Sequence, residues 1–295
     1  RSMSIQKERC WLFVPGHSQK MVDKALGLDV DVIIFDLEDG VPPDKKESAR
    51  CVVAEALGQP ASCAKRFVRV HAAQSAMIQV DLQAIVRPGL AGVVLSKVEE
   101  VEHIEQVDTA LSALEKSVVL PEGEIKLVAL VESARGLVQA PVIANASSRM
   151  AGLMLGAEDY ALDMGFLTLM PDEADALLYA RSGLAVAAAS QKLQAIDKAF
   201  LDLGDAAGLV RETQRARLLG FSGKCLIHPA QIEAVHKGFL PTEEEVAIAR
   251  RIVVAFAAAE ATGSGVTVVD GRMVDLPIVV RARRLLVLNN GKGED

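Results

Sequence analysis

The stretch VIIFDLEDG, residues 32–40, joins four consecutive apolar residues to three acids and a glycine. An apolar run without alternation is typical of a strand covered on both faces, as in a parallel sheet beneath helices. The acids begin where such a strand would end. This stretch therefore predicts the type of sheet, and also the edge of the sheet at which polar side chains gather.

Seven further runs of this kind are spread along the chain. They are Trp11–Val14, Phe67–Val70, Val93–Leu95, Leu127–Val131, Leu153–Leu155 and, less distinctly, Ala195–Leu203 and Lys224–Ile227. Helical patterns fill the gaps, and Asp44 and Asp172 are predicted to cap two of these helices. Eight strands alternating with helices predict an α/β fold, a (β/α)8 TIM barrel over residues 1–240. A doubly wound nucleotide-binding sheet is the alternative, but the chain has no G-x-G-x-x-G turn after its first run and no Walker A loop.

The pattern changes after residue 240. Thr242 and Glu245 form a capping box before a long helical pattern, and the dipeptide Asp270-Gly271 is typical of a hairpin turn. A barrel that closes by residue 240 does not need these elements. We therefore predict that residues 241–295 form a helical and hairpin arm that reaches a neighbouring subunit.

Composition excludes several functional classes. The 295 residues are 51% apolar and 24% charged, which permits a sizeable core. Acids outnumber bases 39 to 32, so the formal net charge of −7 gives no field that would attract nucleic acid or an anionic membrane. No apolar stretch reaches the roughly 18 residues of a membrane span. Four cysteines, at positions 10, 51, 63 and 225, form no C-x-x-C pair, which favours reduced thiols and a cytoplasmic location.

Chemistry in a (β/α)8 barrel occurs at the carboxyl ends of the strands. Ionisable residues follow most of the predicted strands, namely His17, Asp36, Glu38, Asp39, Arg69, His71, Lys97, Glu99, Glu132, Glu158, Asp159 and His228. A single charge at a strand end is usually only solvated. The complete set, however, brings carboxylates and cations to one rim.

Glu132 and Asp159 close two consecutive strands. Neighbouring strands lie about 4.8 Å apart, so these two carboxylates could share a hard cation such as Mg²⁺, completed by waters and substrate oxygens. The alternative is a pair of helix-capping carboxylates.

Arg69 lies inside an apolar run, where a guanidinium is costly to bury unless it is paired. A carboxylate partner is expected, from the protein or from a ligand, and the planar guanidinium suits a substrate carboxylate. Asp36 and Glu38 share one side of their strand, and their role is either catalytic or a salt-bridge network with Arg69 and Lys97. Pro15-Gly16, before a helix start, offers free backbone N–H groups to a phosphate or carboxylate.

Seven motifs, taken in order, resemble the β-subunit of citrate lyase and its stand-alone relatives, the malyl-CoA and citramalyl-CoA lyases of the HpcH/HpaI aldolase superfamily. They are Arg9–Gly16, Phe35–Val41, Leu95–Glu99, Val131–Ser133, Gly156–Asp159, Ile227–Pro229 and Gly271–Pro277. The chain departs from the family pattern at Ser96, where proline is common, and at His71, where asparagine is frequent. The second departure leaves the substrate open.

The resemblance implies a (β/α)8 barrel in a homo-oligomer, a trimer or a hexamer, with Mg²⁺ on Glu132 and Asp159. It implies that Arg69 contacts the substrate and that Asp275 enters the neighbouring subunit's site as an acid/base. The remaining expectations are that Asp36 and Glu38 take part in catalysis and that Arg9, Pro15, Gly16, Lys97 and His228 contact the substrate or coenzyme A.

The implied activity is Mg²⁺-dependent carbon–carbon cleavage of citramalyl-, malyl- or citryl-CoA to acetyl-CoA and a 2-oxo acid. Mg²⁺ would act as a Lewis acid on the hydroxyl, Arg69 would neutralise or clamp an anion, and Asp275 would protonate the enolate carbon. One alternative is a metal-dependent pyruvate aldolase, although such barrels typically carry Glu-His where this chain has Glu38-Asp39. Another is a subunit that works only within a larger complex. A thioesterase or a malate-synthase-like condensation could use the same residues.

Overall fold

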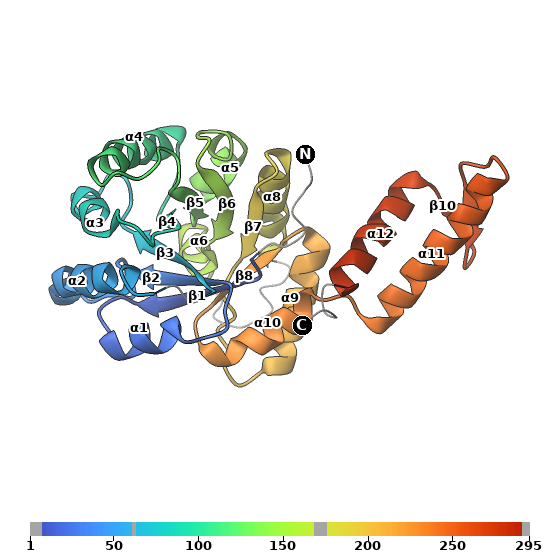
Figure 1. Cartoon of the computed structure of the whole chain (residues 1–295), viewed down its shortest axis with the longest axis horizontal. Coiled ribbons are helices and arrows are strands. Elements are labelled where there is room, and N and C mark those ends of the chain that lie inside the picture. Colours follow the sequence, from blue (N-terminus) through green and yellow to red (C-terminus); the bar gives the residue numbers. More distant parts are fainter. Residues whose placement is uncertain (1–7, 61–62, 168–175, 291–295) are drawn as a thin grey trace. The chain divides into compact units, whose positions relative to one another are not determined.

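The computed structural model describes residues 8–60, 63–167 and 176–290. Eight strands form a closed barrel (Figure 1), in which each strand pairs in parallel with the next and the last pairs with the first. The strands are β1 (Cys10–Pro15), β2 (Val32–Asp36), β3 (Lys65–Val70), β4 (Gly92–Leu95), β5 (Lys126–Val131), β6 (Met150–Leu155), β7 (Gln194–Asp197) and β8 (Gly223–Leu226). The predicted (β/α)8 barrel is confirmed.

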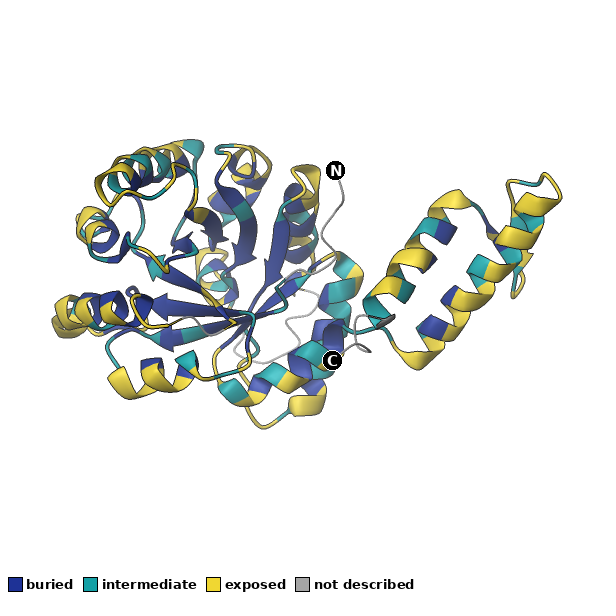
Figure 2. Ribbon diagram, in the orientation of Figure 1, coloured by how far each residue is buried: buried dark blue, intermediate teal, exposed yellow. Residues whose placement is uncertain are grey.

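Helices surround the barrel and cover the outer faces of its strands (Figure 1). They are α1 (Gln19–Leu26), α2 (Lys46–Leu57), α3 (Ile78–Ile85), α4 (Val101–Ser117), α5 (Ala134–Ile143), α6 (Ala157–Asp163), α8 (Leu178–Ser190), α9 (Ala206–Leu219) and α10 (Ile232–Phe239). Two 3₁₀ turns, η1 (Pro43–Lys45) and η2 (Pro229–Gln231), precede α2 and α10. This cover explains why the strands are apolar on both faces (Figure 2).

Alternate strand residues fill the barrel interior. One buried cluster contains Trp11, Ile34, Phe67, Leu130, Met154 and Cys225, together with Val32, Val94, Val128 and Ile196. Side chains two residues apart on a strand share a face. The positions that follow these apolar side chains on the inward face are therefore Asp36, Arg69, Glu132 and Lys198, which places four ionisable groups around the barrel mouth.

Two predicted helix caps and the predicted end of the seventh strand differ from the structure or lie outside the described residues. Asp44 does not cap a helix, because Pro43 begins a 3₁₀ turn that contains Asp44, and α2 starts at Lys46 without a side-chain cap. The seventh strand, predicted to run to Leu203, ends at Asp197, the last of its residues that pairs with β8. The buried Asp197 carboxylate binds Arg181 and Lys224, both at 2.8 Å. The cap predicted at Asp172 lies outside the described residues.

The chain divides into two compact units, one ending at His236 and the other beginning at Lys237. The second contains α11 (Glu243–Ala261), an antiparallel hairpin of β9 (Thr267–Val269) and β10 (Arg272–Val274), and α12 (Leu276–Asn290). The predicted capping box at the start of α11 and the predicted hairpin are both confirmed. Asp270 and Gly271 have positive φ values of 49° and 75°, as a tight hairpin turn requires.

The second unit has a small core of its own, in which Phe256, Val274 and Val279 are buried. Helix α12 was not predicted from the sequence. Among the described residues, no helix is both long enough and apolar enough to cross a bilayer.

Candidate active site

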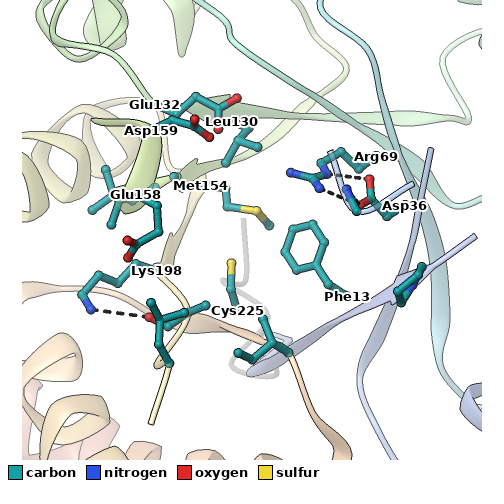
Figure 3. A pocket seen from close by; sticks show the side chains of 18 residues that line it. Phe13, Asp36, Arg69, Leu130, Glu132, Met154, Glu158, Asp159, Lys198 and Cys225 are labelled. Atoms are coloured by element: carbon teal, nitrogen blue, oxygen red, sulfur yellow. Dashed lines mark hydrogen bonds and ion pairs between the residues drawn. The ribbon is translucent and has the colours of Figure 1, made fainter. Parts of the chain in front are cut away.

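A cavity of about 340 Å³ opens at the carboxyl ends of the strands (Figure 3). Its charged lining consists of Asp36, Arg69, Glu132, Glu158, Asp159 and Lys198. Its apolar lining includes Phe13, Leu130, Met154 and Cys225, which continue the barrel core upward. An apolar floor below a ring of convergent charges is the usual form of a small-molecule site.

Glu132 and Asp159 lie on one side of this cavity. Glu132 directly follows β5, and Asp159 lies in the first turn of α6, just after β6. Figure 3 shows their carboxylates side by side. The Glu132 side chain reaches this position because Gly156 lacks a side chain, since a Cβ there would lie 2.6 Å from Oε2 of Glu132.

Burial and the neighbouring Asp159 and Glu38 carboxylates raise the pKa of Glu132 to about 8. A hydrogen bond of 2.8 Å from the backbone N–H of Lys97 to Oε1 of Glu132 lowers this pKa. Lys97 adopts a left-handed backbone conformation, with φ of 53°. The negative charges of Glu132 and Asp159 are close together, and few hydrogen bonds from the described residues offset their repulsion. Such a pair of carboxylates suits a hard divalent cation, which would attract both.

Arg69 and Asp36 lie on another side of the cavity and form a bidentate ion pair. The distances are 2.7 Å from Nε to Oδ1 and 2.6 Å from Nη2 to Oδ2. Asp36 also accepts the backbone N–H groups of Glu38 and Gly40, each at 2.8 Å. Four donors therefore fill both oxygens of Asp36, which favours the network interpretation over a role as a free catalytic base.

Glu38 extends this network to Lys97. Its Oε2 lies 3.4 Å from Nη1 of Arg69, and its Oε1 accepts a hydrogen bond of 2.8 Å from Nζ of Lys97. Burial opposes the charge of Arg69, but the carboxylates of Asp36, Glu38 and Glu132 raise its pKa above the ordinary value. The guanidinium also lies 5.1 Å from the centre of the Phe13 ring. A permanently charged, fixed guanidinium thus borders the cavity.

The other predicted contact residues lie in several places. Pro15 lines the cavity, but the N–H of Gly16 donates to the carbonyl of Asp36 at 2.9 Å, so this N–H is not free as predicted. His228 caps η2 through Nδ1, and its neighbour Ile227 lines the cavity instead.

Arg9 lies at the end of β1 opposite the cavity, and Asp275 lies in the other compact unit. Arg9 precedes β1, whose other end carries Pro15, and six residues of strand span roughly 20 Å. Asp275 belongs to the second unit, where its Oδ1 accepts the N–H of Ile278 at 3.4 Å as α12 begins.

Lys198 is a cavity residue that the sequence analysis missed. The predicted strand ran to Leu203, which hid the end of the strand at Asp197 and hence the residue that follows it. Its Nζ lies 3.7 Å from Oε2 of Glu212 and 3.4 Å from the carbonyl of Ala199. The charged dipeptide Asp197-Lys198 at the end of an apolar run was the signal that could have placed it.

The chain belongs to the HpcH/HpaI aldolase/citrate lyase family, a family of lyases, because the family's sequence model matches residues 9–229. It is 40% identical to the citrate lyase subunit beta of Leuconostoc mesenteroides subsp. cremoris, over 96% of this chain and 93% of that protein. It is 32% identical to the mitochondrial citramalyl-CoA lyase of Rattus norvegicus, over 95% of this chain and 85% of that protein.

A solved structure supports the same assignment. The protein CitE of Mycobacterium tuberculosis, crystallised with magnesium, acetoacetate and coenzyme A, superposes with a TM-score of 0.80 at 32% sequence identity. The match covers 97% of this chain and 99% of that one. The predicted family resemblance is therefore confirmed.

Proposed function

We propose that the chain is a Mg²⁺-dependent carbon–carbon lyase that splits citramalyl-, malyl- or citryl-CoA into acetyl-CoA and a 2-oxo acid. The observation that carries this proposal is that Glu132 and Asp159 line the same cavity as the fixed guanidinium of Arg69. The magnesium, acetoacetate and coenzyme A bound by the M. tuberculosis protein support it.

In this proposal Glu132 and Asp159 hold Mg²⁺. The bound ion supplies Lewis-acid chemistry, which lowers the pKa of the substrate hydroxyl. Arg69 orients the carboxylate of the oxo-acid portion or neutralises the anion that develops during cleavage. Asp36 and Glu38 act on Arg69, because the hydrogen bonds of Asp36 and the ion pair with Glu38 hold the guanidinium in one orientation.

Cleavage passes the hydroxyl proton to solvent water, breaks the carbon–carbon bond and leaves the electron pair on the acetyl thioester as an enolate. We assign the protonation of that carbon to Asp275 of a neighbouring subunit. The arm, residues 241–295, would then complete a neighbour's site within a homo-oligomer. Exposed apolar side chains near Asp275 support an interface there, since Val268 and Met273 are 67% and 65% exposed.

The direct test incubates the purified chain and Mg²⁺ separately with citramalyl-, malyl- and citryl-CoA and measures acetyl-CoA and the oxo acid. We expect release of both products from at least one thioester, and loss of turnover with EDTA. Turnover of a free hydroxy-oxo acid instead would indicate a pyruvate aldolase, and release of free coenzyme A a thioesterase. Either result would contradict the proposal.

The arm has its own test, which uses two inactive variants. Asp159→Asn and Asp275→Asn chains are expected to be inactive alone but to recover part of the activity when co-expressed, because mixed oligomers contain some sites with both acids. Two copies of the Asp159→Asn chain, differing only in their tags, provide the control. No recovery in verified mixed oligomers would contradict a shared site.

A second candidate function is a β-type subunit that acts only within a larger complex. The 40% identity to the citrate lyase subunit beta favours it. Under this alternative the isolated chain would bind Mg²⁺ and the thioester but release no acetyl-CoA until partner subunits are added.

A further inference from the structure

A second group of metal-binding side chains lies at the amino end of the barrel, away from the cavity. Cys10 begins β1, Asp31 directly precedes β2, and His236 is on α10. The Cys10 sulfur, a carboxylate oxygen of Asp31 and a ring nitrogen of His236 all lie within 4.8 Å of one another. Within residues 8–60, 63–167 and 176–290, no other group of three such side chains is found.

The barrel itself brings these three residues together. Trp11 and Val32 are register partners in the β1–β2 pair, so the residues just before them, Cys10 and Asp31, are neighbours. Helix α10 follows β8, which pairs with β1 at Cys10. The Cys10 sulfur lies 3.7 Å from the carbonyl of Ile232, the first residue of α10.

The Asp31 carboxylate is already held in position. The Oδ2 atom of Asp31 accepts the N–H groups of Arg9 at 3.0 Å and of Cys10 at 2.8 Å. Nε2 of His236 lies 4.0 Å from the same oxygen. Metal-ligating carboxylates are typically oriented by such outer hydrogen bonds, which reduce the ordering needed when the ion binds.

The Cys10 thiol and the Asp31 carboxylate could bind a cation together. Cys10 is completely buried, and burial together with Asp31 raises the pKa of its thiol above the ordinary value. The Cys10 thiol can donate to the carbonyl of Ile232, and its sulfur lies beside the Asp31 carboxylate. A divalent ion would replace the thiol proton, which is released to solvent as the sulfur–metal bond forms.

We propose that Cys10, Asp31 and His236 form a second metal site, selective for Zn²⁺ or a similar thiophilic divalent ion over Mg²⁺. A thiolate, an imidazole and a carboxylate are a recognised zinc donor set, whereas Mg²⁺ prefers oxygen ligands throughout. Zinc ligands lie about 2.0–2.3 Å from the ion, so binding draws the three atoms slightly closer than they are now. A water molecule would complete the four ligands of such an ion.

This site has a structural consequence. It connects the start of β1, the approach to β2 and the helix that follows β8, so one ion ties the first two strands to the last helix of the barrel. Zinc binding should therefore stabilise the folded chain without entering the reaction at the opposite end.

The test uses the full chain with the exposed Cys51 and Cys63 replaced by serine and with metal removed by a chelator. Cd²⁺ is then titrated while the ultraviolet thiolate-to-cadmium absorbance is followed, and Zn²⁺ is added in competition. With saturating Mg²⁺ present to occupy the carboxylate site at the opposite end of the barrel, we expect one equivalent of thiolate-bound Cd²⁺ per chain, displaced by Zn²⁺ but not by further Mg²⁺. Binding should weaken by at least about tenfold in Cys10→Ser and His236→Gln variants.

Matched controls locate the site. Cys225→Ser removes the other buried cysteine, His103→Gln removes a histidine on another helix, and Asp159→Asn alters the opposite end of the barrel. All three should keep full Cd²⁺ affinity. Because the His236 side chain is 34% exposed, the His236→Gln variant should fold, which circular dichroism will check. Failure of the parent chain to bind one equivalent, or unchanged affinity in folded His236→Gln protein, would overturn the proposal.

Discussion

Two sides of the same cavity carry acidic residues, but the protein neutralises the charge on one side much more completely than on the other. On the β2–β3 side, Asp36 accepts four hydrogen bonds and Arg69 neutralises it within 2.7 Å. On the β5–β6 side, Glu132 faces Asp159 and receives one backbone N–H, and its pKa is raised to about 8. The comparison teaches that the protein itself satisfies the β2–β3 carboxylate, whereas the crowding of the β5–β6 pair supports the proposal that a cation binds there.

The largest expected effect follows from removing a carboxylate on the uncompensated side. Asp159→Asn should lower kcat/KM by about 10³-fold, since a Lewis acid supplies several kcal/mol to such a reaction. Mg²⁺ affinity, measured by isothermal titration, should fall as well. Glu105→Gln, an exposed position on α4, serves as the control and should retain both. Activity near that of the parent chain in the Asp159→Asn variant would contradict a catalytic cation on the β5–β6 side.

The next effect concerns pH. The folded chain keeps Glu132 protonated up to a pKa of about 8, against an ordinary value of 4.5, so it binds more protons than the unfolded chain between these values. Without Mg²⁺, the free energy of unfolding should therefore fall as pH rises from about 4.5 to 8. Urea unfolding across this range measures the slope.

Two additions sharpen this pH prediction. Saturating Mg²⁺ should reduce the slope, because the ion favours the ionised carboxylate, and Glu132→Gln should reduce it without Mg²⁺. A slope that is the same in the parent chain and in Glu132→Gln would assign the pH dependence to other groups.

A smaller effect is expected on the compensated side. Asp36→Asn leaves the buried guanidinium of Arg69 without its main partner, which should lower the free energy of unfolding by about 3 kcal/mol. Asp159→Asn should not destabilise the Mg²⁺-free chain, because it relieves repulsion with Glu132. Denaturant melts of the two variants in EDTA compare the sides directly. Equal destabilisation by both substitutions would show that the two sides do not differ in compensation.

Much of the barrel could be predicted from the sequence because each strand is apolar on both faces and ends at a polar residue. The period of two then predicts which ends face inward, as Asp36, Arg69 and Glu132 do. The rest depended on contacts that no local pattern encodes. The sequence left open whether Arg69 pairs with the protein or with a ligand, and only the β2–β3 register places it opposite Asp36.

Other features were hidden for different physical reasons. Lys198 was missed because apolar residues continue past the true end of β7. The N–H of Gly16 was predicted to be free for a ligand, but it donates to the carbonyl of Asp36 on the neighbouring strand. This contact depends on the pairing of β1 with β2, which the sequence does not show. Cys10, Asp31 and His236 come from three separate segments and meet only because the barrel closes.

The most direct measurement for the central claim is diffraction from crystals grown with Mn²⁺, which takes the oxygen ligands of Mg²⁺ and gives an anomalous signal. The account predicts one strong anomalous peak at the barrel mouth, bonded to carboxylate oxygens of both Glu132 and Asp159. A peak bound to other residues, or carboxylates that turn away from a shared ion, would contradict it.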